Sequence, residues 1–142
     1  MIKIYVMKTI IESQELGLAM FFGLVKFSPR ERYHQAAIMV TIDEVLIFDD
    51  TKIDLIDEGG KTKYHQARFK MHLTNIAFVT DEKLVGRRKL KGWHRIVLSS
   101  KNGREIIVIF SPRKQNKNRK RFLKQFRDFK IEVAKGKADI SI

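Results

Sequence analysis

The chain has 142 residues, among them 29 Lys and Arg, 16 Asp and Glu and no cysteine, which gives a formal net charge of +13. This length fits one domain, and the missing cysteine excludes a disulfide framework, a thiolate nucleophile and a cysteine-ligated zinc site. No apolar run reaches the roughly 18 residues of a membrane span, so we expect a cytoplasmic protein that is able to lie peripherally on a membrane. The positive charge favours a polyanionic partner, either nucleic acid, acidic lipid or acidic protein.

The N-terminal part of the chain predicts an extension followed by the first strand of a domain. We expect residues 1–19 to be the extension and residues 20–130 to form the domain. Residues 2–7 are a candidate extra strand, although apolar runs of this length do not distinguish a strand from a buried helix. Residues 20–27 predict the first strand of the domain, and residues 28–32 predict the loop that follows it.

Two short apolar runs, at residues 37–42 and 45–48, predict a hairpin with its turn at residues 43–44. A sequence echo overlaps this region, because Tyr-His-Gln-Ala occurs at residues 33–36 and again at residues 64–67. The echo indicates either two similar strand-turn-strand units or a coincidence. Two copies are too few for a solenoid.

The middle of the chain predicts one more strand region and a second hairpin. Two apolar runs, at residues 95–98 and 106–110, flank Asn102 and Gly103. Asn-Gly tolerates the two positive φ angles of a two-residue type I′ turn, so this pair predicts a tight hairpin. Residues 71–79 predict a strand region with inward side chains at Leu73, Ile76 and Phe78.

The C-terminal part predicts an amphipathic helix. Ser111 is a suitable N-cap, and Pro112 fits the first helical position because its missing N–H costs nothing there. We expect the helix to cover residues 112–129 and residues 131–142 to form a tail. An apolar stripe at helical spacing should cover the sheet, and its members are Phe122, Leu123, Phe126 and Phe129.

This order of elements resembles the pleckstrin-homology-like superfamily, including its bacterial and GRAM-like members. The resemblance covers residues 20–130. This chain departs from the family in one respect: many members have a tryptophan in the closing helix, whereas the one tryptophan of this chain is Trp93, before that helix. The resemblance implies an α+β, mostly β fold: a partly open antiparallel β-barrel or sandwich of about seven strands, capped by one C-terminal amphipathic helix. The segments that support it are residues 23–27, 28–32, 37–42, 45–48, 93–110 and 112–129.

The resemblance also suggests a binding site in the first loop. In lipid-binding members, the loop between the first two strands has a basic pattern that binds phosphate groups. Lys26, Arg30 and Arg32 reproduce a lysine followed by Arg-x-Arg. Guanidinium groups bind phosphate oxygens in a bidentate manner, and a lysine adds a mobile charge. In a chain with 29 basic residues, such spacing also arises by chance.

Two further basic clusters are candidate anion-binding sites. The first, within residues 83–95, surrounds Trp93, which could stack on a base, lie at a membrane interface or simply anchor the sheet core. Its candidate residues are Arg87, Arg88, Lys89 and Lys91. The second lies on the helix opposite the apolar stripe, where it could contact a phosphate backbone or an anionic bilayer, or form a solvated outer face. Its candidate residues are Lys117, Lys120, Lys124 and Arg127.

Catalytic motifs are missing from the sequence. It contains no nucleophile elbow, glycine-rich phosphate loop or His-Glu-x-x-His motif, and its four histidines are dispersed. We therefore expect a non-enzymatic module without a cofactor or metal, which recognises an acidic membrane surface or an acidic protein. The alternative is non-specific nucleic-acid binding. Membrane docking predicts basic loops gathered at one open end of the barrel, whereas nucleic-acid binding predicts one stripe along the helix and residues 83–95.

Overall fold

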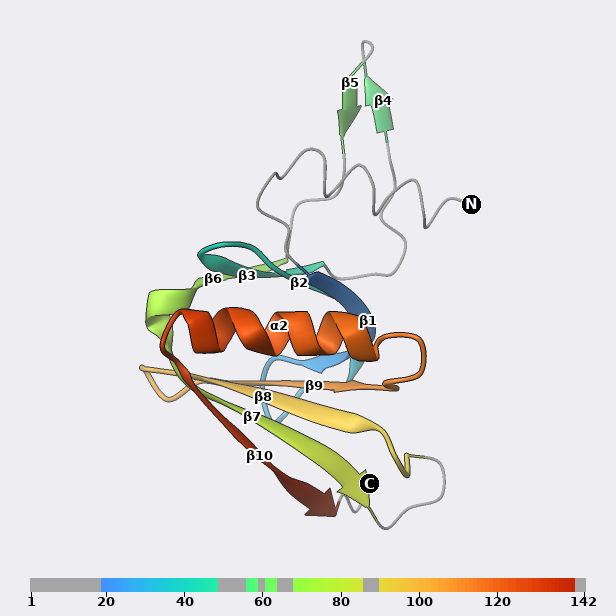
Figure 1. The fold of residues 1–142 in the computed structure, drawn as a ribbon. Coiled ribbons are helices and arrows are strands. Elements are labelled where there is room, and N and C mark those ends of the chain that lie inside the picture. The colour runs from blue at the N-terminus through green and yellow to red at the C-terminus, as the bar shows by residue number, and fades with distance from the viewer. Residues whose placement is uncertain (1–18, 49–55, 59–60, 64–67, 86–89, 140–142) are drawn as a thin grey trace.

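The computed structural model describes residues 19–48, 56–58, 61–63, 68–85 and 90–139. The predicted extra strand, the second Tyr-His-Gln-Ala copy and the candidate residues Arg87, Arg88 and Lys89 lie outside the described residues. The strands and helices, shown in Figure 1, are β1 (Ala19–Lys26), β2 (His34–Val40), β3 (Glu44–Phe48), β4 (Ile56–Glu58), β5 (Lys61–Lys63), β6 (Phe69–His72), the 3₁₀ helix η1 (Leu73–Asn75), β7 (Ile76–Val85), β8 (His94–Ser100), β9 (Glu105–Phe110), α2 (Asn116–Asp128) and β10 (Glu132–Asp139).

Eight strands form one sheet in the order β10-β7-β8-β9-β1-β2-β3-β6, and β4 pairs separately with β5. All neighbours in the large sheet are antiparallel except β10 and β7, which are parallel. The sheet bends around α2, which lies across it (Figure 1). This is an α+β, mostly β, PH-like fold, as the order of elements predicts. Within the described residues, no helix is long and apolar enough to cross a membrane.

The core lies between the concave face of the sheet and the apolar stripe of α2. Phe122, Leu123 and Phe126 are buried, as the helical spacing predicts. The Phe21 ring packs 4.6 Å from Phe110 and 5.1 Å from Phe122, measured between ring centroids. Burial of each such ring contributes about 1.5–3 kcal/mol, so α2 is held on the sheet chiefly by its phenylalanines.

The helix begins later than predicted, at Asn116 rather than at Pro112. The chain first makes a turn, in which the Gln115 N–H donates to the Pro112 carbonyl at 2.9 Å and Lys114 takes a φ of +63°. The Gln115 side chain then accepts from the Phe22 N–H at 2.7 Å and donates to the Phe22 carbonyl at 3.0 Å. These contacts satisfy polar backbone groups of β1 and explain why the first residues after Pro112 are not helical.

The predicted C-terminal tail is wrong, because residues 132–139 form β10 in parallel register with β7. A turn after the helix reverses the chain: the Ile131 N–H donates to the Phe126 carbonyl and the Lys130 N–H to the Arg127 carbonyl, each at 2.9 Å. Ile131 and Ala138 are buried. Exposed lysines between them hide the strand pattern in the sequence. The strand completes the eight-stranded sheet, one more than the family resemblance implies.

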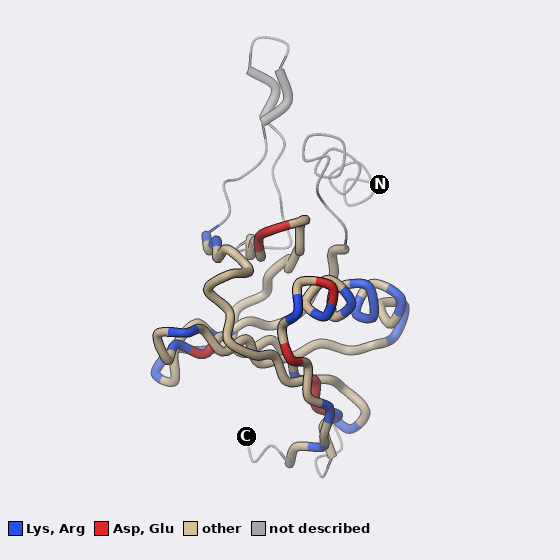
Figure 2. The backbone as a smooth tube through the Cα atoms, turned by 60° about the vertical axis from the view of Figure 1, so that its left-hand side comes forward, with Lys and Arg blue, Asp and Glu red and all other residues tan. Residues whose placement is uncertain are grey.

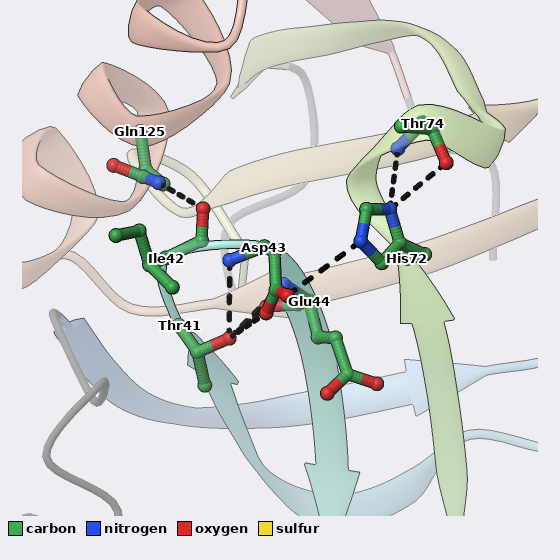
Figure 3. Close-up of polar contacts among 7 residues, drawn as sticks. All are labelled: Thr41, Ile42, Asp43, Glu44, His72, Thr74 and Gln125. Atoms are coloured by element: carbon green, nitrogen blue, oxygen red, sulfur yellow. Dashed lines mark hydrogen bonds and ion pairs between the residues drawn. The ribbon is translucent and has the colours of Figure 1, made fainter.

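Both predicted hairpins form, but each has a different turn from the one expected. Thr41 pairs with Glu44 through a backbone hydrogen bond of 2.8 Å, so the β2–β3 turn is at Ile42 and Asp43, one residue earlier than predicted. The Thr41 hydroxyl accepts from the Glu44 N–H at 3.0 Å, and the Gln125 side-chain amide donates to the Ile42 carbonyl at 2.8 Å (Figure 3). The end of α2 is thereby tied to this turn.

The β8–β9 connection is a three-residue loop rather than a two-residue type I′ turn. The Ser100 N–H donates to the Arg104 carbonyl at 2.8 Å, and only Gly103 in the loop has a positive φ, of +88°. The Asn102 side chain instead accepts from the Arg104 N–H at 3.1 Å. The Asn-Gly pair therefore predicts the position of the hairpin correctly. The loop has one residue with a positive φ instead of two, and the hydrogen bond to the Asn102 side chain stabilises it.

The predicted strand at residues 71–79 is split by η1. Leu73 and Ile76 are buried as expected, but Phe78 is 43% exposed and Val79 is buried instead. The cause is a register shift between Ile76 and Phe78 in the pairing with β8, which reverses the alternation. Strand β6 pairs with β3 whereas β7 pairs with β8 and β10, so the two segments of the sequence echo do not form similar hairpins.

Candidate anion-binding sites

The loop between β1 and β2 presents two arginines to solvent. Arg30 and Arg32 are exposed and flank Glu31. The Glu31 carboxylate accepts from the Phe27 N–H at 3.2 Å and lies 3.9 Å from an Arg68 guanidinium nitrogen. Glu31 therefore folds the loop back on β1 and directs the two flanking side chains outward.

Two arginines from other strand connections lie beside this loop. Arg68 lies over the Phe27 ring at 4.9 Å, and Arg104 lies over the Phe69 ring at 5.3 Å. The Phe27 and Phe69 rings are 5.6 Å apart between centroids, so the two guanidinium groups lie over two neighbouring rings, one over each. We call the group formed by Arg30, Arg32, Arg68 and Arg104 the barrel-end cluster.

Lys26, the third predicted residue of the first-loop site, lies on the other face of β1 from the buried Phe27. Its Nζ is 5.4 Å from the centroid of the Tyr33 ring. Tyr33 packs with an apolar cluster on the outer face of the sheet, formed by Leu84, Ile109 and Ala138. Burial raises the pKa of the Tyr33 phenol above the ordinary value of 10.0, and the charge of Arg95 opposes this rise. The structure thus gathers Arg30 and Arg32 in the barrel-end cluster and keeps Lys26 on the outer face.

The outer face of α2 is cationic. At 100° per residue, the four predicted residues and Arg121 lie opposite the buried phenylalanines, and all five are exposed. The one acidic residue of the helix, Asp128, accepts from Lys124 at 2.8 Å. Blue positions recur along α2 in Figure 2. We call this surface the α2 stripe, and its members are Lys117, Lys120, Arg121, Lys124 and Arg127.

An open groove of about 620 Å³ lies between the β7–β8 end of the sheet and the start of α2. Of the predicted second cluster, Lys91 is the described member, and it lines this groove. Three other cations line it as well, so residues far apart in the sequence meet here. The lining residues are Lys83, Lys91, Gly92, Trp93, His94, Ser111, Pro112, Arg113, Asn116 and Arg119.

A buried ion-pair network supports the groove. Asp81 is 4% exposed and accepts from Arg119 Nη1 at 2.5 Å and contacts His94 Nδ1 at 3.0 Å. The Asn116 side-chain oxygen accepts from Arg119 Nε at 3.0 Å and from Nη2 at 2.8 Å. The His94 ring stacks on Phe110 at 6.0 Å between centroids. These contacts hold the Arg119 guanidinium at one position at the edge of the groove.

Trp93 is half-buried and packs with the outer apolar cluster of Leu84, Ile109 and Ala138. Its neighbour His94 contacts Asp81 and Phe110 on the inner face. Because successive side chains of a strand point to opposite faces, the indole belongs to the outer surface. Trp93 therefore packs against the sheet, but on its outer face rather than in the main core, where the interpretation of Trp93 as a core anchor put it. Within the described residues, no group of three His, Asp or Glu could hold a metal ion.

Two positions in the sequence indicate this buried ion-pair network. Arg119 precedes Phe122 by three residues and Leu123 by four, so it lies on the apolar face of the helix rather than on the basic one. Asp81 follows the buried Val79 by two residues and therefore shares its inward face. A charged residue at an inward position of each element indicates a buried pair, because an unpaired charge there is too costly.

Comparison with known proteins supports the fold. No family model matches the chain, and no curated protein matches it in sequence. The structure of Vav1 inhibited by an allosteric inhibitor that blocks GEF activity is similar, with a TM-score of 0.50 at 16% identity, covering 79% of this chain and 26% of that one. The apo structure of an activated truncation of Vav1 has a TM-score of 0.50 at 17% identity, with 79% and 25% covered. This chain spans about a quarter of their length.

Both likenesses agree with a mostly β fold in which one sheet packs against a single helix. At such identities the likeness is one of fold. The hSac2 domain from the human phosphoinositide phosphatase Sac2 has a TM-score of 0.37 at 12% identity, covering 97% of this chain and 90% of that one.

Proposed function

We propose that the chain is a non-enzymatic PH-like module that docks on an anionic membrane surface through the barrel-end cluster. The observation that supports this function is the convergence of four arginines from three strand connections, with Glu31 as the acidic residue among them. Arginine forms bidentate hydrogen bonds with phosphate oxygens, and each cation near an anionic surface contributes about 1 kcal/mol. Arg30 and Arg32 are exposed, so they can reach a flat surface.

The test is co-sedimentation of the full chain with vesicles of phosphatidylcholine, with and without about one third phosphatidylserine. Two cations at about 1 kcal/mol each correspond to roughly a 30-fold loss of affinity. We therefore expect Arg30→Ala/Arg32→Ala to weaken binding to the acidic vesicles by that factor. The matched control is Lys120→Ala/Arg127→Ala, which removes the same charge from the α2 stripe and should weaken binding less than 3-fold. Equal losses in both variants would contradict docking through the barrel end.

Non-specific nucleic-acid binding is the second candidate function. It is favoured by the groove, which joins Lys83 and Lys91 of the β7–β8 end to Arg113 and Arg119 beside α2. It predicts duplex binding whose affinity falls linearly with log salt and does not respond to Arg30→Ala/Arg32→Ala. If the chain binds the duplex in this way and ignores acidic vesicles, the membrane function is wrong. If it binds neither, an acidic protein partner becomes the better proposal.

A further inference from the structure

The groove is a separate place from the barrel-end cluster. It lies at the His94 end of β8, whereas the cluster lies beyond Ser100 at the other end of the same strand. Six residue steps at about 3.3 Å correspond to roughly 20 Å. A ligand in the groove is therefore independent of the proposed membrane contact, and the two can be tested separately.

The groove has more positive charge than the fold uses. Asp81 is engaged by Arg119 and His94. Within the described part of the chain, no acidic group pairs with the other three lining cations, Lys83, Lys91 and Arg113. Toward the described residues, this concave surface therefore presents three cations that make no ion pair.

Strand β10 adds further charge beside the groove. Its register places Lys135 opposite Asp81 and Lys137 opposite Lys83. Directly opposed residues of neighbouring strands share one face of a sheet, and both lysines are exposed. The potential in the groove is therefore reinforced from a third element, and it favours a ligand with more than one negative charge.

Arg119 is arranged in advance to bind an anion. A guanidinium has five N–H groups, and Arg119 uses one on Nε, one on Nη1 and one on Nη2 for Asn116 and Asp81. One N–H remains on each terminal nitrogen. Because the side chain is already fixed, binding through these groups loses little conformational freedom.

We propose that this groove binds the phosphate group of a small phosphorylated ligand. Arg119 and Arg113 donate to the phosphate oxygens, and Lys83 and Lys91 balance its charge. A lone carboxylate has one negative charge and would leave most of the lining cations unmatched, whereas a phosphate monoester or diphosphate matches them. A volume of about 620 Å³ is within the ordinary range for small-molecule sites.

The experiment is a titration of the full chain with inorganic pyrophosphate, followed by amide chemical shifts in ¹H–¹⁵N spectra. We expect the largest changes at Gly92, His94 and Arg113. Lys91→Ala/Arg113→Ala removes two exposed cations and should weaken binding at least 10-fold while leaving the rest of the spectrum in place. The control Lys120→Ala/Arg127→Ala has the same change of charge and should stay within 3-fold of the parent chain. Equal weakening in the control, or shift changes centred on the α2 stripe, would overturn the proposal.

Two further arms distinguish a lipid headgroup from a soluble phosphate ester. Vesicles containing phosphatidic acid present the phosphate on a membrane, and glycerol 3-phosphate presents it in solution. If the groove variant loses binding to both the vesicles and glycerol 3-phosphate, the site recognises the phosphate group alone. If it loses only vesicle binding, the natural ligand is a lipid headgroup. Arg30→Ala/Arg32→Ala should retain pyrophosphate binding. If that variant loses it while the groove variant keeps it, the groove proposal is wrong and the barrel-end site stands.

Discussion

Replacing Asp81 by alanine should destabilise the protein severely, although Asp81 is not part of the apolar contact between the helix and the sheet. The carboxylate is 4% exposed, and the Arg119 side chain with which it pairs is 11% exposed. Removing one member of a buried pair leaves the other charge uncompensated, which costs about 3–5 kcal/mol. A domain of this size has a free energy of unfolding of about 5–15 kcal/mol, so Asp81→Ala should lose a large part of it.

Urea unfolding measures this loss. With a slope of about 2 kcal/mol per molar urea, the unfolding midpoint should fall by roughly 1.5–2.5 M. Glu82→Ala is the matched control, because the adjacent Glu82 pairs with Arg95 on the outer face at 3.0 Å with both side chains more than a fifth exposed. Such a pair contributes about 1 kcal/mol or less. Equal midpoints for the two variants would show that Asp81 is solvated and that the groove lacks a fixed Arg119.

Two other predictions concern single side chains. Lys130 follows α2 with a φ of +62°, where glycine is unstrained, so Lys130→Gly should raise the free energy of unfolding by about 0.5–1 kcal/mol. The control Lys124→Gly, inside the helix, should lower it by about 1 kcal/mol. Changes of the same sign for both variants in urea unfolding would contradict this prediction. Burial raises the pKa of Tyr33, so its stabilising effect is present below pH 10 and lost as the pH rises through the folded-state pKa. The free energy of unfolding of Tyr33→Phe should therefore fall less than that of the parent chain as the pH rises above 10, and identical pH profiles would contradict the raised pKa.

The elements that the sequence predicted are those whose signals are local. The apolar stripe of α2 and the runs on both sides of Asn102 and Gly103 specify their structures through spacing alone. The errors occur where tertiary contacts decide. The register shift after Ile76 turned Phe78 outward, and the Gln115 side chain, bound to β1, delayed the start of the helix. Neither contact has a signature in the local pattern.

The barrel-end cluster could be predicted only in part, for a related reason. Arg30 and Arg32 are two residues apart in the sequence and follow a family pattern, so their loop was identified. Arg68 and Arg104 enter the cluster because the Phe27 and Phe69 rings lie side by side. That meeting depends on long-range strand pairing, which no single segment encodes. Sequence therefore identified half of this cluster, and whether the cluster binds a membrane stays a prediction.

The basic residues of α2 and of the segment just before it have two different physical roles. A count of charges does not distinguish these roles. Arg119 lies on the apolar face and compensates the buried Asp81, so its charge stabilises the fold. Lys120, one residue later, lies on the outer face and is exposed. A rotation of 100° between neighbouring residues separates these roles. Arg113, before the helix, faces the groove. A ligand in the groove would thus contact a guanidinium that the fold already holds in place, while the charges of the α2 stripe remain available to a different surface.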